Sequence, residues 1–206
     1  MKLLHVDSSI LGAQSATREL GAAIVENRRR DDSHAEVRYR DLALEPLNHL
    51  TGALVAARAA AAPLADPELQ KDVAASARAM DDFQWADVIV IGAPMYNFSI
   101  PSQLKAWIDR IAVAGVTFRY TANGPEGLAS GKKIIVVSAR GGMYGTGAPA
   151  ARLDFQETYL RGVFGFLGIT DVEFVRAEGL NMGAETRAAA LAAAHATIDR
   201  RLPLAA

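Results

Sequence analysis

The chain of 206 residues contains no cysteine, which excludes disulfide bonds, thiolate metal sites and cysteine nucleophiles. It also has no long apolar run, because the longest, from Val88 to Tyr96, is less than half the length that a membrane crossing needs. The chain also lacks an excess of positive or negative charge. Its net charge of −1 predicts neither nucleic-acid binding nor the strongly acidic surface of an electron carrier. His5 and Asp7 interrupt the start before a stretch of signal-peptide length can form, so we expect a cytoplasmic protein with no membrane contact.

The pattern of apolar residues predicts an α/β fold in one domain over residues 1–206. Half of the residues are apolar and 22% are charged, as in ordinary globular proteins. Four aliphatic segments are predicted as buried strands and one alternating segment as an edge strand, namely 3–6, 88–91, 134–137 and 172–175, with 36–39 at the edge. Helical patterns lie between them over 16–30, from Pro101 onward, and over 155–167 and 184–202, and the alanine-rich stretch 53–65 is interpreted as a helical arm. Strands that alternate with helices predict a parallel sheet covered on both faces.

The loop after the first strand is rich in hydroxyl groups and runs into a helix. Ser9, Ser15 and Thr17 would add donors to the free N–H groups at the start of that helix, which favour an anion. Helix capping by Ser15 is the simpler alternative. The loop has neither the G-x-G-x-x-G nor the Gly-Lys-Ser pattern, so a classical nucleotide site is not supported.

The loops after the 88–91 and 134–137 strands have a different composition. Residues 93–98 read Ala-Pro-Met-Tyr-Asn-Phe, and these thioether, aromatic and amide side chains are unusual in a plain turn. Residues 138–145 contain paired glycines, which let a backbone approach a ligand and direct N–H groups at it, although a flexible turn is the alternative. Since ligands of open parallel sheets bind at the carboxyl ends of strands, the three loops together predict a phosphorylated planar ring, which fits flavin mononucleotide (FMN).

Long motifs resemble the family of FMN-dependent NADH-azoreductases, which also act as NADH:quinone oxidoreductases. The resemblance extends over nearly the whole chain and is carried by the motifs at 8–17, 93–98, 103–105, 114–128, 131–133, 140–142 and 165–171. It implies a flavodoxin-like three-layer sandwich with a five-stranded parallel sheet of order 2-1-3-4-5. It also implies a homodimer whose active sites lie at the interface, with one tightly bound FMN per subunit.

The same resemblance implies which residues hold the cofactor. Those expected at the FMN phosphate are Ser9, Ser15, Ala16 and Thr17, and those expected around the ring are Pro94, Met95, Tyr96, Asn97, Phe98, Ala139, Arg140, Gly141 and Gly142. Ala16 and Ala139 depart from the family pattern, which usually has hydroxyl or amide side chains there.

A substrate pocket is expected over the ring. The resemblance places Phe118 and Tyr120 on a covering loop, and Tyr144 and Phe164 would add aromatic walls. For Phe164, packing in the core is the favoured alternative.

The chemistry is expected to belong to the cofactor rather than to a catalytic side chain. NADH would reduce the flavin, and quinones or aromatic azo compounds would then be reduced in the same pocket by a ping-pong mechanism. The four histidines have no ligand spacing, so no metal site is expected, and Asp31–Asp32 and Asp81–Asp82 are interpreted as solvated loop residues. A flavodoxin-type electron-transfer protein is the alternative function.

Overall fold

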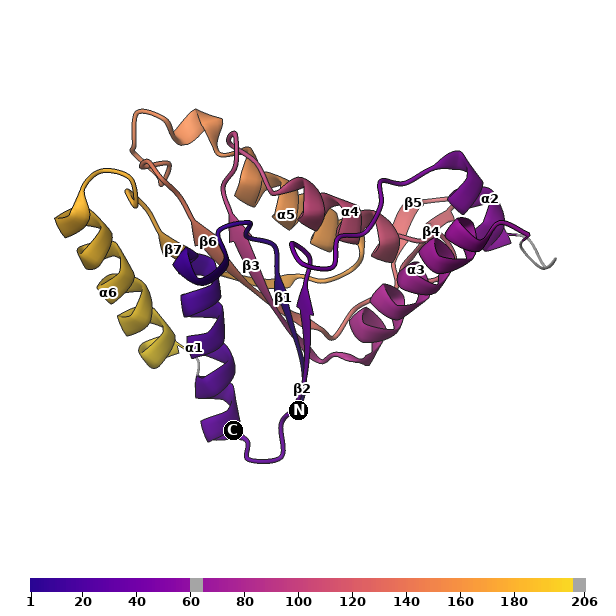
Figure 1. The fold of residues 1–206 in the computed structure, drawn as a ribbon, viewed down its shortest axis with the longest axis horizontal. Helices are drawn as coiled ribbons and strands as arrows, with labels where there is room; N and C mark the ends of the chain where they lie inside the picture. Colours follow the sequence, from indigo (N-terminus) through magenta and orange to yellow (C-terminus); the bar gives the residue numbers. More distant parts are fainter. Residues whose placement is uncertain (60–64, 202–206) are drawn as a thin grey trace.

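Five parallel strands form the central sheet (Figure 1) of the computed structural model, which describes residues 1–59 and 65–201. The strands are β1 (Lys2–Asp7), β2 (Glu36–Asp41), β3 (Val88–Pro94), β6 (Lys133–Ala139) and β7 (Asp171–Ala177). Their order is β2-β1-β3-β6-β7, which is 2-1-3-4-5 when the strands of this sheet alone are counted. Every predicted strand is present, and each extends beyond its predicted segment because the ladder of backbone pairs continues past it. The α/β prediction is therefore confirmed.

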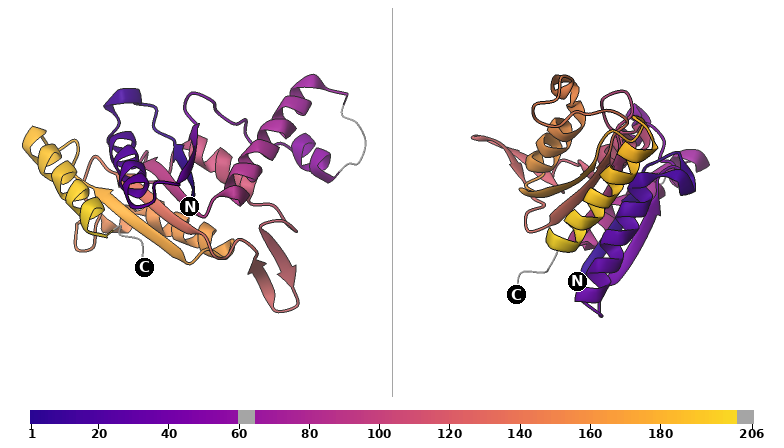
Figure 2. Two further views of the ribbon diagram at one scale, coloured as in Figure 1. Left: turned by 90° about the horizontal axis from the view of Figure 1, so that it is seen from below. Right: turned by 90° about the vertical axis from the view of Figure 1, so that its left-hand side faces the viewer.

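One face of the sheet is covered by α1 (Ala16–Asp31) and α6 (Ala184–Arg201), which lie side by side (Figure 2). Leu20 and Ile24 of α1 and Ile198 of α6 pack on Val90 and Val137 of the sheet. The Ser15 side chain caps α1 by accepting the N–H of Arg18, and basic residues end the helix as the sequence predicts. Leu202, the last residue of the predicted 184–202 helix, lies outside the described residues.

The opposite face is covered by three helices and holds the larger core. They are α3 (Pro67–Trp85), α4 (Ser102–Ile111) and α5 (Phe155–Phe166). Phe83, Trp107 and Phe164, one from each helix, are fully or almost fully buried against the sheet. The two cores on opposite faces make the molecule a three-layer structure. Pro101 was expected in the first turn of its helix but stands just before it, at the N-cap of α4.

Short elements complete the chain: the 3₁₀ turns η1 (Gly12–Gln14) and η2 (Ala151–Leu153), the helix α2 (Gly52–Ala59), and the hairpin strands β4 (Phe118–Thr121) and β5 (Gly124–Gly127). α2 forms the first part of the predicted arm over 53–65, and residues 60–64 of that arm lie outside the described residues. Within the described part of the chain, no helix combines the length and the apolar character required to span a membrane.

The sequence analysis missed α3, although its start carries a clear signal. Asp66 accepts the N–H of Glu68 at 2.9 Å, and Pro67 occupies the first turn, where its missing N–H costs little. The assignment of Asp81 and Asp82 to a solvated loop is wrong, because both lie in α3 and Asp82 is only 2% exposed. Arg38 and Arg40 of β2 reach across to Asp82 and pair with it. This pairing across the chain explains how a carboxylate can be buried there.

The hairpin of β4 and β5 projects from the amino end of the sheet (Figure 2). Phe118 packs on Phe166 at the end of α5, with ring centroids 4.5 Å apart. At the base of the hairpin, Gly127 lies against Gly168 so closely that a Cβ on Gly127 would stand 2.1 Å from the Gly168 nitrogen. Two backbones therefore meet where neither has a side chain, and this contact sets the direction of the hairpin.

Candidate functional site

Three loops at the carboxyl ends of β1, β3 and β6 are joined to one another. The Ser8 hydroxyl donates to the Gly92 carbonyl at 2.6 Å, and the Met95 N–H donates to the Ala139 carbonyl at 2.8 Å. The Ser9 and Tyr96 hydroxyl oxygens are 3.4 Å apart. The structure thus brings together the three loops that the sequence singles out, as the topology of a parallel sheet requires.

The hydroxyl groups of the first loop gather at the start of α1. Ser15 Oγ and Thr17 Oγ1 are 3.0 Å apart, and both side chains are buried. Ala16 and Thr17 occupy the first turn of the helix, where backbone N–H groups have no intrahelical partner. Ala16 can therefore contribute its backbone but nothing else. These donors and the positive end of the helix form a suitable place for a phosphate.

The Tyr96 hydroxyl, from the loop after β3, contacts the loop after β1. Its oxygen accepts the N–H of Ile10 at 3.3 Å and lies beside Ser9 Oγ. The Ile10 N–H and the Ser9 hydroxyl thus both lie within hydrogen-bond distance of one oxygen atom that belongs to another loop. A phosphate oxygen accepts hydrogen bonds from the same kinds of group, so the position of the Tyr96 hydroxyl is compatible with the predicted phosphate site.

The loop after β3 contains a strained turn. Asn97 and Phe98 have φ angles of 47° and 70°, and Tyr96 and Ser99 exchange two backbone hydrogen bonds of 3.0 Å around them. Positive φ at both central positions characterises a type I′ turn, in which asparagine is favoured first and glycine second. A phenylalanine in the second position costs energy that glycine would avoid. The Phe98 side chain, which is 41% exposed, is therefore a candidate for a ligand contact.

The glycine loop after β6 is built by backbone pairing with the segment that follows β7. The carbonyls of Gly141 and Gly142 accept the N–H groups of Asn181 and Gly179 at 3.0 and 2.9 Å. Among the described residues, the N–H groups of Gly141 and Gly142 have no acceptor, so both remain available to a ligand. A Cβ on Gly141 would stand 2.6 Å from the Asn181 side chain. A larger residue at position 141 would therefore require the Asn181 side chain to move, whether or not a ligand comes close.

The side chain of Arg140 makes its ion pairs within the protein. Its guanidinium is fully buried and pairs with Asp154, Glu157 and Glu178. Its backbone N–H donates to Ala177 and its carbonyl accepts from Leu180, so its donors are engaged within the protein. Arg140 therefore supports the glycine loop through contacts within the protein, and its contact with the cofactor stays a prediction.

The aromatic residues predicted for a substrate pocket are in three different places. Tyr144 lies beside Phe98 in an edge-to-face contact, with ring centroids 6.1 Å apart. Phe164 is fully buried in the core, so its prediction as a pocket wall is wrong and the alternative of core packing is correct. Phe118 and Tyr120 contact each other on the hairpin, and Tyr120 is 75% exposed. Because the hairpin stands at the amino end of the sheet, these two rings cannot cover the loops of their own chain.

A groove of about 660 Å³ opens beside the ring loop and extends over the start of α4. The residues that line it are Ile10, Tyr96, Asn97, Ser99, Ile100, Ser102, Gln103, Lys105 and Tyr159. Its size is within the range of small-molecule sites. Ile10 comes from the loop after β1 and Tyr96 and Asn97 from the loop after β3, so residues of both loops line the groove.

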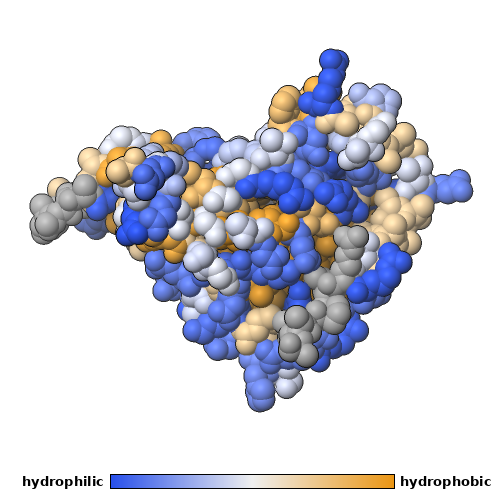
Figure 3. Space-filling model, turned by 180° about the vertical axis from the view of Figure 1, so that it is seen from behind, coloured by the Kyte–Doolittle hydropathy of each residue, from blue (hydrophilic) through white to orange (hydrophobic). Residues whose placement is uncertain are grey.

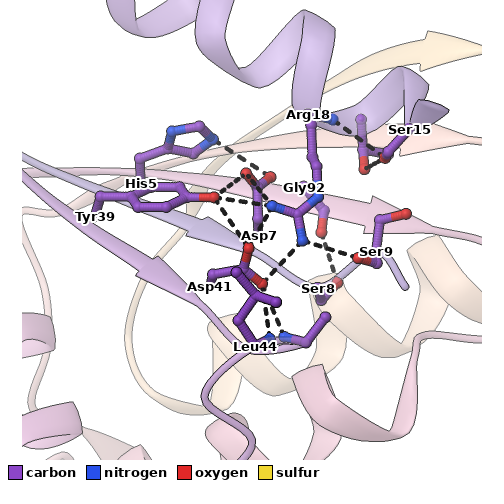
Figure 4. A network of polar contacts seen from close by, with 12 residues as sticks. His5, Asp7, Ser8, Ser9, Ser15, Arg18, Tyr39, Asp41, Leu44 and Gly92 are labelled. Atoms are coloured by element: carbon purple, nitrogen blue, oxygen red, sulfur yellow. Dashed lines mark hydrogen bonds and ion pairs between the residues drawn. The ribbon is translucent and has the colours of Figure 1, made fainter. Parts of the chain in front are cut away.

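Two residues that the sequence analysis missed, one buried and one partly buried, hold the loops in place. Gln156 of α5 donates to the Ala93 carbonyl at 3.1 Å and accepts from Ser138, so it joins the ends of β3 and β6. Arg18 of α1 donates to the Ser9 carbonyl at 2.9 Å and pairs with Asp41 (Figure 4). The hydrogen bond from Arg18 holds the pKa of the Asp41 carboxyl below its usual range. Neither residue stands in a recognisable motif, and only the fold brings each to the site.

The sheet order and the cluster of loops at its carboxyl edge define the class of protein, a flavodoxin-like protein. A family model described as a flavodoxin-like fold matches residues 1–202.

Comparisons with individual proteins show which members of this class the chain is similar to. An FMN-dependent NADH:quinone oxidoreductase of Sinorhizobium fredii is 61% identical over 198 residues, which are 96% of this chain and 95% of that protein. The solved structure of an azoreductase from Bacillus anthracis is 31% identical with a TM-score of 0.83, covering 97% of this chain and 99% of that chain. An FMN-dependent NADH-azoreductase of the same species, solved in complex with FMN, is 25% identical with a TM-score of 0.84, covering 97% and 98%. The chain belongs to the flavodoxin-like family of FMN-dependent NADH:quinone oxidoreductases, which confirms the resemblance found in its motifs.

Proposed function

We propose that the protein is an FMN-dependent NADH:quinone oxidoreductase that also cleaves aromatic azo compounds to amines. The observation that carries the proposal is the strained turn at Asn97 and Phe98 beside two glycine N–H groups and a hydroxyl-rich helix start. Three kinds of ligand contact meet there: an aromatic surface, backbone donors and an anion site. The printed names of the similar proteins support the same activity. The chain acts in this proposal as a single FMN-binding domain.

The phosphate of FMN would be held by Ser9, Ser15 and Thr17 and by the backbone of Ala16. Ser9 and the Ile10 N–H, which now contact the Tyr96 hydroxyl, would be the groups available to the phosphate. The ring would then lie along the segment from Pro94 to Phe98. These residues bind and orient the cofactor but transfer no proton.

Bound FMN would supply the redox chemistry, by accepting a hydride from NADH and passing two electrons to a flat oxidant. The chain's own contribution is electrostatic. The free N–H groups of Gly141 and Gly142 can stabilise the negative charge of a reduced ring, because fixed donors in a site with little water act strongly on nearby charge. Ala139, which carries no hydroxyl group, would contribute only its backbone.

The hairpin leads us to propose a homodimer with one FMN per subunit and the active sites at the interface. Phe118 and Tyr120 expose aromatic surface at the amino end of the sheet, far from the loops of their own chain. If they cover a flavin, it must be the flavin of a second copy. Tyr144, beside Phe98, would complete the aromatic wall from within the same chain.

A single flat pocket cannot hold nicotinamide and oxidant together, so the two substrates would bind in turn. Steady-state rates measured at several fixed quinone concentrations are expected to give parallel double-reciprocal lines. Intersecting lines would contradict the shared pocket.

The proposed activity is tested directly by adding NADH, without air, to the purified protein loaded with FMN. We expect the flavin absorbance to bleach and to return when a quinone is added. A flavodoxin-type electron-transfer protein, the alternative function, would bind FMN but would not be reduced by NADH at a comparable rate.

A further inference from the structure

Arg18 joins the start of α1 to the ends of β1 and β2 (Figure 4). Its Nη2 atom donates to the Ser9 carbonyl and to Asp41 Oδ1, each at 2.9 Å. Its Nη1 atom donates to the Tyr39 hydroxyl at 3.0 Å and to the second oxygen of Asp41. One guanidinium thus fixes the backbone of Ser9 at the point where the predicted phosphate loop leaves the sheet.

Two buried carboxylates share this cation. Asp41 pairs with Arg18 directly, and Asp7 lies 3.6 Å from Arg18 Nη1. Asp7 is only 2% exposed, accepts the Tyr39 hydroxyl at 2.9 Å, and has His5 3.5 Å from its other oxygen. His5 adds positive charge only when it is protonated. Within residues 1–59 and 65–201, Arg18 is therefore the one permanent cation in contact with both carboxylates.

Asp7 lies directly behind the phosphate loop. A Cβ placed on Gly92 would stand 2.5 Å from Asp7 Oδ1 and 3.4 Å from Thr17 Oγ1, so these two atoms face each other across the same glycine. A phosphate that bonded to Thr17 would thus have a buried carboxylate close behind it. Like charges at such a distance inside a protein repel strongly unless a cation offsets them.

We propose that Arg18 is a positioning residue of the flavin-phosphate site, which holds the Ser9 carbonyl and offsets the charges of Asp7 and Asp41. The proposal rests on the proposed function, since it assigns Arg18 to the phosphate of the same cofactor. Arg18 touches no reacting atom, and its effect is confined to the part of the ligand that carries the phosphate.

Riboflavin, which has the ring of FMN but lacks the phosphate, provides the matched ligand. We would measure the affinities of the apoprotein for FMN and for riboflavin by quenching of flavin fluorescence, in the wild type and in Arg18→Gln. The variant is expected to bind FMN about tenfold to a hundredfold more weakly, because a charge that offsets two carboxylates near the phosphate is lost. Riboflavin affinity is expected to change by less than about threefold, since Arg18 bonds to Ser9, Tyr39 and Asp41 and to none of residues 94–98, along which the ring is proposed to lie.

Further variants separate charge from folding. Arg18→Lys keeps the charge and is expected to keep most of the preference for FMN over riboflavin. This variant can also be measured if Arg18→Gln does not fold. Asp7→Asn removes a negative charge behind Thr17 and is expected to increase that preference. Arg38→Gln, which breaks an ion pair between β2 and α3 far from the loop, is the control and should leave the preference unchanged.

The outcomes decide whether Arg18 positions the phosphate site or only supports the fold. Equal weakening of FMN and riboflavin in Arg18→Gln, or an unchanged FMN affinity, would overturn the proposal and leave Arg18 as a support of the fold. An Asp7→Asn variant that binds FMN no better than the wild type would refute the charge argument. A wild-type apoprotein that binds neither flavin would overturn the proposed function, and this inference with it.

Discussion

The strained turn predicts that Phe98→Gly will be more stable than Phe98→Ala, which is the reverse of the usual order for glycine and alanine. Glycine normally destabilises a structured position by about 0.5–1 kcal/mol relative to alanine, because it loses more backbone freedom on folding. At a φ of 70°, however, an L-residue carries a penalty of about 1–2 kcal/mol that glycine does not. The difference favours Phe98→Gly over Phe98→Ala by about 0.5–1 kcal/mol.

Both substitutions remove the phenyl ring, so their other costs cancel. The ring makes an edge-to-face contact with Tyr144, and such contacts contribute about 0.5–1.5 kcal/mol. Thermal unfolding of the apoproteins checks the order: the glycine variant should melt higher by about 1–4 °C, as expected for about 0.5–1 kcal/mol in a chain of this size. Flavin binding, measured on the same samples, should weaken in both variants to the same extent.

Two results would refute this reasoning. If the glycine variant melted below the alanine variant, the positive φ would carry no strain that glycine relieves. If both variants bound FMN as tightly as the wild type, Phe98 would not contact the ring, and the strain would need another explanation.

Other residues give independent tests of the site and the core. Replacing Ser9 and Thr17 by alanine should weaken FMN binding by about 1.5–3 kcal/mol for each charged hydrogen bond lost, while riboflavin binding and melting stay nearly constant; an unchanged FMN affinity would contradict the phosphate assignment. Phe164→Ala should lower the free energy of unfolding by about 3–5 kcal/mol in urea, because it leaves a cavity in the core, and a loss below about 1 kcal/mol would contradict full burial. The pKa of Asp41 is lowered chiefly by its hydrogen bond from Arg18, so this pair stabilises the fold at neutral pH, and the contribution is lost as the pH falls through the folded pKa. Asp41→Asn should therefore flatten the acid side of the plot of unfolding free energy against pH. An unaltered acid side would argue against the pair.

The sheet and its loops could be predicted because their signals are local. Aliphatic runs such as 88–91 are typical of buried parallel strands, and the topology of such a sheet brings the following loops together. Ser9, Tyr96 and Gly142 were therefore predicted into one cluster, and the structure places them there. Their contacts with a flavin stay predictions.

The parts that sequence could not provide depend on distant segments. Asp82 is buried only because β2 supplies two arginines, and no local pattern in α3 reports this. Arg140 follows a strand like a ligand residue, yet the carboxylates that surround its guanidinium come from other segments. The positive φ of Phe98 was equally hidden, since phenylalanine itself argues against such a turn.

The close approach of Gly127 and Gly168 has a consequence for whatever binds the hairpin. Because the two backbones pack without intervening side chains and Phe118 packs on Phe166, the hairpin is anchored at its base before any partner arrives. Association then requires little new ordering of the chain, and less of the binding free energy is lost as conformational entropy. A side chain larger than glycine at position 127 could not fit without a shift of the Gly168 backbone, so this contact constrains how the hairpin leaves the rest of the chain.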